Sequence, residues 1–194
     1  MSLKSKIGII LIMIFILLGS ANYLIQRFII YEKFITFERD EAKKDLERCV
    51  KALKREIFHL NVVCDDWAAW NDTYDFVVSA SKDYIESNLV IETFTDNKIN
   101  LIYIIDKKGK VVWGNIFDLE TEETIKLADF PIDHFPNTHP LISPIYEKIQ
   151  TLTTSVSGIL MTKVGPMLIS SLPIRTSNNE GPARGFFIMG RFSK

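Results

Sequence analysis

Residues 156–192 read VSGILMTKVGPMLISSLPIRTSNNEGPARGFFIMGRF, and they set the kind of fold that the rest of the chain must complete. Three apolar runs are separated by Gly165–Pro166 and by the polar turn at residues 177–182. Apolar runs of this length between turns that contain Gly and Pro are typical of neighbouring antiparallel strands. The pattern predicts a three-strand meander at about residues 156–192.

A second β signal lies upstream, at residues 98–117, which read KINLIYIIDKKGKVVWGNIF. Two runs rich in β-branched and aromatic residues flank Asp106–Gly109, where the glycine suits a positive φ. These residues predict a hairpin. The Pro-rich residues 118–144 predict irregular structure, with short helices at about residues 120–127 and 145–151.

A long helix is predicted at about residues 31–67, which contain neither Gly nor Pro. Its apolar residues recur at spacings of three and four, as on one face of a helix. This stripe consists of Ala42, Leu46, Val50, Leu53, Ile57, Leu60, Cys64 and Trp67. It can pair with a second copy as a parallel dimer stalk, or pack on the chain's own sheet. Both can hold, with the first half dimerising and the second half packing.

These elements together predict the fold class. A further helical turn is expected at residues 82–89, between the long helix and the hairpin. A long amphipathic helix, a hairpin and a meander make an α+β domain with a single, mainly antiparallel sheet.

The beginning of the chain has a different character, because Ile7–Gln26 contain no charged residue. About twenty helical residues span roughly 30 Å, the thickness of the hydrocarbon layer of a bilayer. We predict a transmembrane helix at residues 7–28 after a short cytoplasmic start at residues 1–6. A cleaved signal peptide is the alternative, since the small residues 19–21 suit a peptidase. The apolar character that resumes at residues 23–30 favours a retained anchor.

Two signals on the orientation of this anchor oppose each other. Five basic residues at positions 27–44 follow the span and only Lys4 and Lys6 precede it, which by the positive-inside rule places the C-terminal part inside. A long folded domain behind a short start often translocates regardless of charge. We therefore expect residues 29–194 to be extracytoplasmic in a single-pass protein of the cell (inner) membrane.

The composition argues against several classes of function. The 194 residues carry 23 basic and 24 acidic side chains, so the chain lacks the excess of positive charge that nucleic-acid binding needs. Two cysteines cannot build a disulfide framework or a four-thiolate zinc site. The sequence contains no P-loop, dinucleotide-binding glycine motif or nucleophile elbow. We expect no nucleic-acid partner, no cofactor, no metal and no enzymatic activity.

The densest group of candidate site residues is DDWAAWNDTYDF, at residues 65–76. Aromatic walls with a few polar groups suit a small-molecule pocket. The same residues can instead be core, with the motif fixing the helix to the sheet. If the stretch is helical, Trp70 and Tyr74 stack one turn apart. Asp65 and Asp66 are adjacent and point to different sides of a helix, which argues against a two-carboxylate glycosidase.

Other candidates are more isolated. Arg175, Arg184 and Arg191 lie in or beside the predicted meander, where an Arg can bind a carboxylate through two hydrogen bonds or lie at a solvated edge. His134 and His139 favour a solvated loop over a zinc site. For Cys64, a buried free thiol is favoured over an intermolecular disulfide.

Two blocks of these residues resemble a known family. Asp66–Phe76, with Tyr84 and Asn88–Leu89 behind it, resembles the opening motif of the type-four CHASE domains, which are extracytoplasmic sensor modules of histidine kinases and cyclic-dinucleotide enzymes. The resemblance to the closing strands of that family is carried by Gly158–Leu160, Gly165–Pro166, Leu172–Ile174, Glu180–Gly185 and Ile188–Arg191. It covers roughly residues 33–191.

The resemblance implies a Cache-like or PAS-like ligand-sensing fold, two membrane helices, dimeric signalling and an output module after the last strand. The second membrane helix and the output module do not occur in these 194 residues. We expect a membrane-anchored small-ligand sensor domain of a histidine kinase or diguanylate cyclase, here lacking its output module. A stand-alone adaptor or dimerisation protein is the alternative.

The expected site and partners follow from this interpretation. The expected ligand-binding residues are Trp67, Trp70, Asp72, Tyr74, Asn88, Tyr103 and Arg175. The expected partners are an unidentified small molecule, a second copy paired in parallel through the long helix, and the membrane.

Overall fold

The computed structural model describes residues 3–146 and 154–193. The chain divides into two units, Met1–Ala52 and Leu53–Lys194. The first unit is helical in its described residues, which comprise α1 (Leu3–Ile25), a π-helical segment η1 (Gln26–Ile30) and the beginning of α2 (Tyr31–Ala68).

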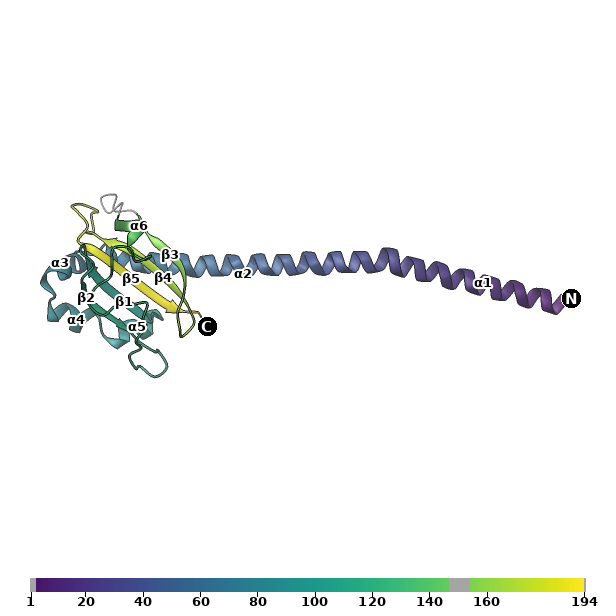
Figure 1. The fold of residues 1–194 in the computed structure, drawn as a ribbon, viewed down its shortest axis with the longest axis horizontal. Coiled ribbons are helices and arrows are strands. Elements are labelled where there is room, and N and C mark those ends of the chain that lie inside the picture. The colour runs from purple at the N-terminus through teal and green to yellow at the C-terminus, as the bar shows by residue number, and fades with distance from the viewer. Residues whose placement is uncertain (1–2, 147–153, 194) are drawn as a thin grey trace. The chain divides into compact units, whose positions relative to one another are not determined.

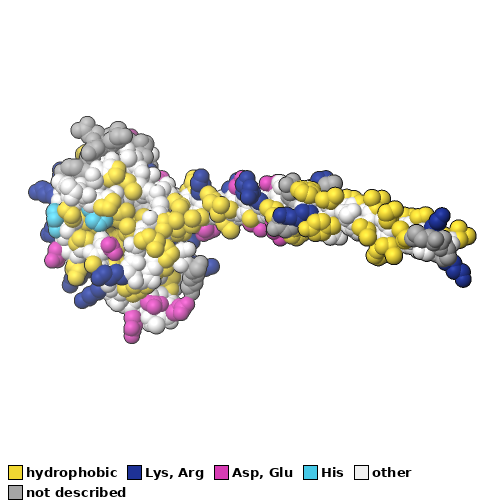
Figure 2. Space-filling view, turned by 45° about the vertical axis from the view of Figure 1, so that its right-hand side comes forward, with side chains coloured by type: hydrophobic (Ala, Val, Ile, Leu, Met, Phe, Trp, Pro, Cys, Tyr) yellow, Lys and Arg dark blue, Asp and Glu magenta, His cyan; other side chains and the backbone are white. Residues whose placement is uncertain are grey.

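Hydrophobic side chains cover α1 (Figure 2). They are exposed throughout the helix, with Ile9 at 45% and Phe15 at 80%. Among the described residues, the N-terminal helix contains one stretch whose length and apolar composition suffice to cross a bilayer.

The second unit contains a five-stranded antiparallel sheet in the order β2-β1-β5-β4-β3, drawn in Figure 1. Its strands are β1 (Leu101–Asp106), β2 (Val111–Ile116), β3 (Val156–Met161), β4 (Pro166–Ile174) and β5 (Gly185–Phe192). The hairpin β1–β2 and the meander β3–β4–β5 are the two β signals of the sequence, and the pairing of β1 with β5 joins them. The turn of the hairpin has Gly109 at a φ of 90°, as expected.

The second half of α2 packs on one face of this sheet. Leu60, Cys64 and Ala68 are completely buried and belong to a cluster that includes Ile102 and Phe187, which we call the helix-side core. The first half of the same stripe is exposed, with Leu46 at 65% and Val50 at 42%. The predicted α+β fold, with a long helix on a single antiparallel sheet, is therefore confirmed. Two roles were considered for the stripe, pairing with a second copy and packing on the chain's own sheet. The second half of α2 packs on the chain's own sheet.

The motif after α2 is not a continuous helix. α2 ends at Ala68, and Trp70 is extended, with φ −110° and ψ 134°, before α3 (Asn71–Ser79) begins. The condition for the expected stacking of Trp70 on Tyr74, a continuous helix through both residues, is therefore not met, and the Trp70 ring contacts Trp67 and Tyr84. The predicted turn at residues 82–89 is present as α4 (Lys82–Asn88), and α5 (Ile91–Asn97) follows without having been predicted.

The other face of the sheet is covered by residues 117–142, which are irregular, and by α6 (Ser143–Tyr146). Phe130, Phe135 and Ile142 pack there on Tyr103 and Ile188 in a second cluster, which we call the far-side core.

The helix predicted at residues 120–127 is absent. Asp118 Oδ1 instead accepts hydrogen bonds from the backbone N–H groups of Glu120 and Thr121, and Phe117 pairs with Thr124 as an isolated β-bridge. Such a side-chain turn offers the backbone an alternative to the helix. The helix predicted at residues 145–151 overlaps α6 at residues 145–146, and its remainder lies outside the described residues.

Candidate functional site

The two sequence blocks that stood out meet at one end of the sheet. β4 ends at Ile174, β5 begins opposite it at Gly185, and the loop 175–184 between them contacts residues 65–75 at the end of α2 and in α3. We call this set of contacts the helix–loop lock.

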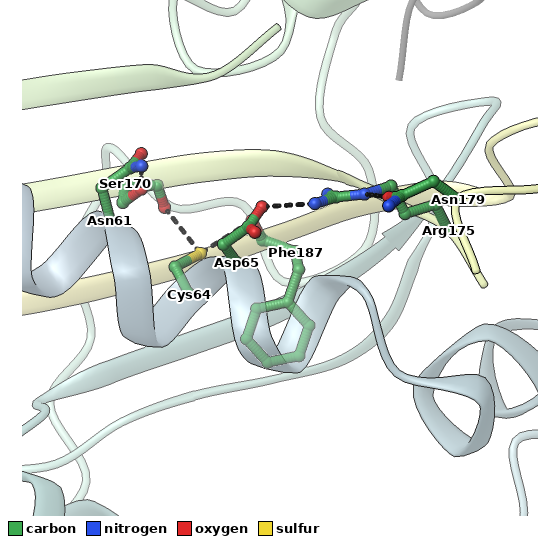
Figure 3. Close-up of polar contacts among 7 residues, drawn as sticks. All are labelled: Asn61, Cys64, Asp65, Ser170, Arg175, Asn179 and Phe187. Carbon is green, nitrogen blue, oxygen red and sulfur yellow. Dashed lines mark hydrogen bonds and ion pairs between the residues drawn. The ribbon is translucent and has the colours of Figure 1, made fainter. Parts of the chain in front are cut away.

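Arg175 is the most buried polar side chain of the lock, with 10% of its side chain exposed. Its NH2 donates to Asp65 Oδ1 at 2.7 Å, and its Nε donates to Asn179 Oδ1 (Figure 3). Its backbone N–H donates to the carbonyl of Ala68 at 2.8 Å, so the loop is bound to the end of α2 by main chain as well. NH1 is buried and has no hydrogen-bond partner among the described residues. Arg175 thus binds the chain's own carboxylate rather than lying at a solvated edge.

Tyr74 and Arg184 form the second part of the lock. The Arg184 guanidinium lies 3.7 Å from the centroid of the Tyr74 ring, and its NH1 donates to Asp75 Oδ1 at 2.8 Å and to the carbonyl of Tyr74 at 2.9 Å. Tyr74 in turn donates its hydroxyl to the carbonyl of Pro182. Asn71 Oδ1 accepts the backbone N–H of Ser177 at 3.0 Å. The first residues of α3 therefore bind the loop at Ser177, Pro182 and Arg184.

Trp67 and Trp70 belong to the edge of the helix-side core. The Trp67 ring contacts Trp70 edge-on at 6.1 Å and Phe187 at 6.0 Å, measured between ring centroids. Trp70 also contacts Tyr84, which stacks on Phe76 at 4.4 Å. Aromatic pairs in these geometries contribute stability beyond the burial of their area. Both tryptophans therefore serve packing between α2, α3, α4 and β5.

The side chains of Cys64 and Ser170, which lie between α2 and β4, both form hydrogen bonds. Cys64 Sγ donates to the carbonyls of Ser170 and Phe187 at 3.6 and 3.5 Å, and the Ser170 hydroxyl donates to Asn61 Oδ1 (Figure 3). Cys64 is a free thiol, and burial raises its pKa to about 12. The pKa of Tyr84 is likewise raised to about 12 by burial. In both cases burial disfavours the ionised form, so the thiol and the phenol are neutral near neutral pH.

The structure brings together only some of the predicted site residues. Trp67, Trp70, Tyr74 and Arg175 lie in or beside the lock. Asn88 is half-buried and donates its side-chain amide to the carbonyl of Tyr84. Asp72 is exposed in the first turn of α3, where a carboxylate interacts favourably with the helix dipole.

Tyr103 lies apart from the other predicted residues. It belongs to the far-side core, because its neighbours Ile102 and Ile104 face α2 and alternate residues of a strand face opposite sides. The seven predicted residues therefore do not line a single pocket.

Sequence reasoning missed an open hollow at the opposite end of the sheet, where β5 ends at Phe192 opposite Met167. The hollow has a volume of about 840 Å³, and we call it the terminal hollow. It is lined by Glu56, Thr95, Lys98, Asn100, Asp118, Leu119, Glu120, Ile125, Val164, Gly165, Pro166, Leu168, Arg191, Phe192 and Ser193. Of the residues that the sequence analysis singled out, Gly165, Pro166 and Arg191 line the hollow, but none of them indicated a cavity there.

Arg191 connects three elements beside the terminal hollow. Its Nε and NH2 donate to the carbonyls of Lys98 and Asn97 at the end of α5, at 2.7 and 3.1 Å. Its NH1 lies 3.4 Å from Glu56 Oε2 on α2, in a pair whose side chains are 25% and 47% exposed. The last strand is thus bound firmly to α5 and loosely to α2.

Comparison with known proteins identifies relatives of this fold. The family model of the CHASE4 domain matches residues 52–194. The "Methanogenesis regulatory histidine kinase FilI" of Methanothrix harundinacea is 29% identical over 139 residues, which are 72% of this chain and 15% of that protein.

Two solved structures share the fold at lower identity. One is the extracellular domain of a protein named as a histidine kinase, vpHK1S-Z8, with a TM-score of 0.58 and 16% identity over 81% of this chain and 60% of that one. The other is a domain of a protein from Vibrio parahaemolyticus named as a sensory box/GGDEF family protein, with a TM-score of 0.54 and 15% identity over 78% of this chain and 59% of that one.

Proposed function

The chain belongs to the CHASE4 domain family, and on this premise we propose that it is a membrane-anchored, extracytoplasmic sensor domain that responds to a small ligand. The observation that carries the proposal is the division of α2. Leu60, Cys64 and Ala68 are buried in the core beside the sheet, while Leu46 and Val50 on the same stripe are exposed. In this proposal a rearrangement of the sheet displaces α2, which continues beyond the sheet.

Membrane anchoring is supported by α1. Its apolar side chains are exposed on all sides, and contact with water would be unfavourable for them. A bilayer removes this cost, and the length of the helix suffices to cross one. The proposal places residues 29–194 outside the cytoplasm and assigns no catalytic step to them.

The signalling step requires two arrangements of α2 on the sheet. A ligand shifts the balance between them only by its difference in affinity for the two. Because the helix-side core is closely packed with aromatic rings, α2 is expected to change position as a rigid element rather than to deform.

The sensor function can be tested on the full chain in nanodiscs. All three tryptophans, at positions 67, 70 and 113, lie in the folded domain, so tryptophan fluorescence reports its unfolding without interference from the anchor. A ligand at a hundredfold excess over its Kd is expected to stabilise the domain by about 2.7 kcal/mol. A broad set of metabolites that leaves the unfolding temperature unchanged would contradict the proposal.

Parallel dimerisation through the first half of α2 is part of the same proposal. Exposed Leu46 and Val50 support it, because an amphipathic helix buries such a stripe when a second copy is available. The chain contains two cysteines, of which Cys49 is exposed beside the stripe and Cys64 is buried with a raised pKa. A thiol cross-linker therefore reports on Cys49.

Covalent dimers are expected from the wild-type chain and from Cys64→Ala, but not from Cys49→Ser. The double variant Leu46→Glu/Val50→Glu should abolish cross-linking while leaving tryptophan fluorescence unchanged. The same chain cross-linked after unfolding gives the level of random collisions. If the folded wild-type chain gives no more cross-linked product than this level, the proposed dimer is overturned. A dimer that forms while no metabolite binds would instead favour the adaptor function.

A further inference from the structure

We propose that the terminal hollow binds a small molecule that carries a protonated amine on an apolar body. This inference rests on the proposed sensor function and locates its ligand site. The hollow lies at the end of the sheet where Arg191 and Phe192 close β5, away from the lock at Ile174 and Gly185.

The walls of the hollow offer apolar contact from both cores. Leu168 and Leu119 belong to the helix-side core or pack against it, while Ile125 and Phe192 pack against the far-side core. Leu168 is 4% exposed, and the other three are half-buried. Ligand sites combine such apolar walls with a few polar groups that fix orientation.

The frame of the hollow is fixed before any ligand arrives. Asn100 is 7% exposed, and its side chain donates to the carbonyl of Phe117 at 2.9 Å and accepts the backbone N–H of Phe192 at 3.0 Å. Its backbone binds Gly190 and Phe117 in addition. A single buried amide thus holds the ends of β5 and β2 together, so ligand binding does not have to order them first.

The charges of the lining favour a cation. The lining contains three acidic residues, Glu56, Asp118 and Glu120, and two basic residues, Lys98 and Arg191. The Arg191 guanidinium already donates to two backbone carbonyls and to Glu56, so it would have to leave them to bind an anion.

Asp118 uses Oδ1 for the backbone N–H groups of Glu120 and Thr121, and its other carboxylate oxygen takes no part in these hydrogen bonds. Asp118 is therefore the carboxylate best placed to accept a hydrogen bond from an ammonium group.

Three probes with the same apolar body separate the contributions of charge and of apolar contact. They are 2-phenylethylamine, 2-phenylethanol and 3-phenylpropionate, titrated into the full chain in nanodiscs with tryptophan fluorescence and unfolding temperature as readouts. The amine is expected to bind most tightly and the carboxylate least tightly. Binding of the amine should weaken as salt is added, since exposed charges are screened.

The variant Asp118→Asn tests the site, because the amide oxygen can still accept the two backbone hydrogen bonds of the turn. The Kd of 2-phenylethylamine should rise about fivefold, the factor that a partly exposed ion pair supplies. The matched control is Asp83→Asn, an exposed carboxylate in α4 outside the hollow, for which the Kd should not change.

Three results would overturn the inference: equal Kd values for Asp118→Asn and Asp83→Asn, a carboxylate probe that binds at least as tightly as the amine, or no binding of any of the three probes. If a metabolite from the broad set stabilises the chain in any of these cases, the sensor function stands and only the assignment of this site fails. If no metabolite does so either, both fail.

Discussion

The two ends of the sheet differ in how completely internal contacts close them. At the lock, Arg175 and Arg184 bind carboxylates and carbonyls of the chain itself, and the loop is fastened to α2 and α3. At the terminal hollow, Glu56 is half-exposed and lies 3.4 Å from Arg191 in a long ion pair. The first end is closed by internal bonds, and the second leaves a volume of about 840 Å³ open.

This difference parallels the distribution of the residues that resemble the family. In the lock, residues 66–76 of the first block that resembles the family contact residues 180–185, one segment of the second block. Most of the lining of the hollow, including Asp118, Leu119 and Ile125, lies outside both blocks.

The largest expected effect follows from Gly185, where the closed end begins. A Cβ at this position would lie 1.9 Å from the backbone oxygen of Ile105, so β1 and β5 would have to separate. We expect Gly185→Ala to destabilise the domain by about 3 kcal/mol, measured by urea unfolding with tryptophan fluorescence. Gly158→Ala in β3 is the control, because a Cβ there meets nothing within 4 Å. Equal free energies of unfolding for the two variants would contradict the close approach of β1 and β5 at Gly185.

Much of the fold could be predicted because its signals are local. The runs of β4 and β5 are punctuated by Gly165–Pro166 and Gly181–Pro182, and the apolar spacing of α2 is regular to Cys64. The end of α2 has no such signal, since Ala68–Ala69–Trp70 contains no helix breaker. It is imposed by tertiary contact, because Arg175 donates its backbone N–H to the carbonyl of Ala68 that a longer helix would use itself.

The candidate site was less predictable for a related reason. Arg175 and Asp65 are 110 positions apart, and nothing in either neighbourhood indicates the pair. The terminal hollow is built from the ends of several segments, so it has no motif. The position of Tyr103 could have been predicted, because the alternation of β1 places it opposite Ile102 and Ile104.

The second effect concerns the ion pair of the lock. Asp65→Ala leaves the Arg175 guanidinium buried with Asn179 as its remaining side-chain partner, and we expect a loss of about 2 kcal/mol. The neighbouring Asp66 is exposed, so Asp66→Ala should change the unfolding free energy by less than about 0.5 kcal/mol. Equal losses in the two variants would show that the pair does not hold the closed end.

The third effect is a loss of stability at alkaline pH. Because burial raises the pKa of Cys64 from 9.0 to about 12, the unfolded chain ionises this thiol first. The stabilisation is therefore complete below pH 9 and is lost as the pH rises towards 12. We expect a decrease in the unfolding free energy of about 1 kcal/mol between pH 9 and pH 10 from this group.

The variant Cys64→Ala isolates this contribution, because it removes the thiol and retains Tyr84, whose pKa is also raised to about 12. Its unfolding free energy should fall less steeply over the same range of pH. An identical slope for the variant and the wild-type chain would show that water reaches the thiol, and that the core beside the lock is not dry.

The smallest effect is expected at the open end. Glu56 and Arg191 are 3.4 Å apart and both partly exposed, so Glu56→Gln should cost less than about 0.5 kcal/mol. Glu86→Gln, on an exposed position of α4, provides the baseline for removing a surface carboxylate. A loss for Glu56→Gln as large as that for Asp65→Ala would mean that the open end is tied to α2 as tightly as the closed end. In that case α2 could not respond to a ligand in the hollow without breaking a strong contact, and the contrast between the two ends would fail.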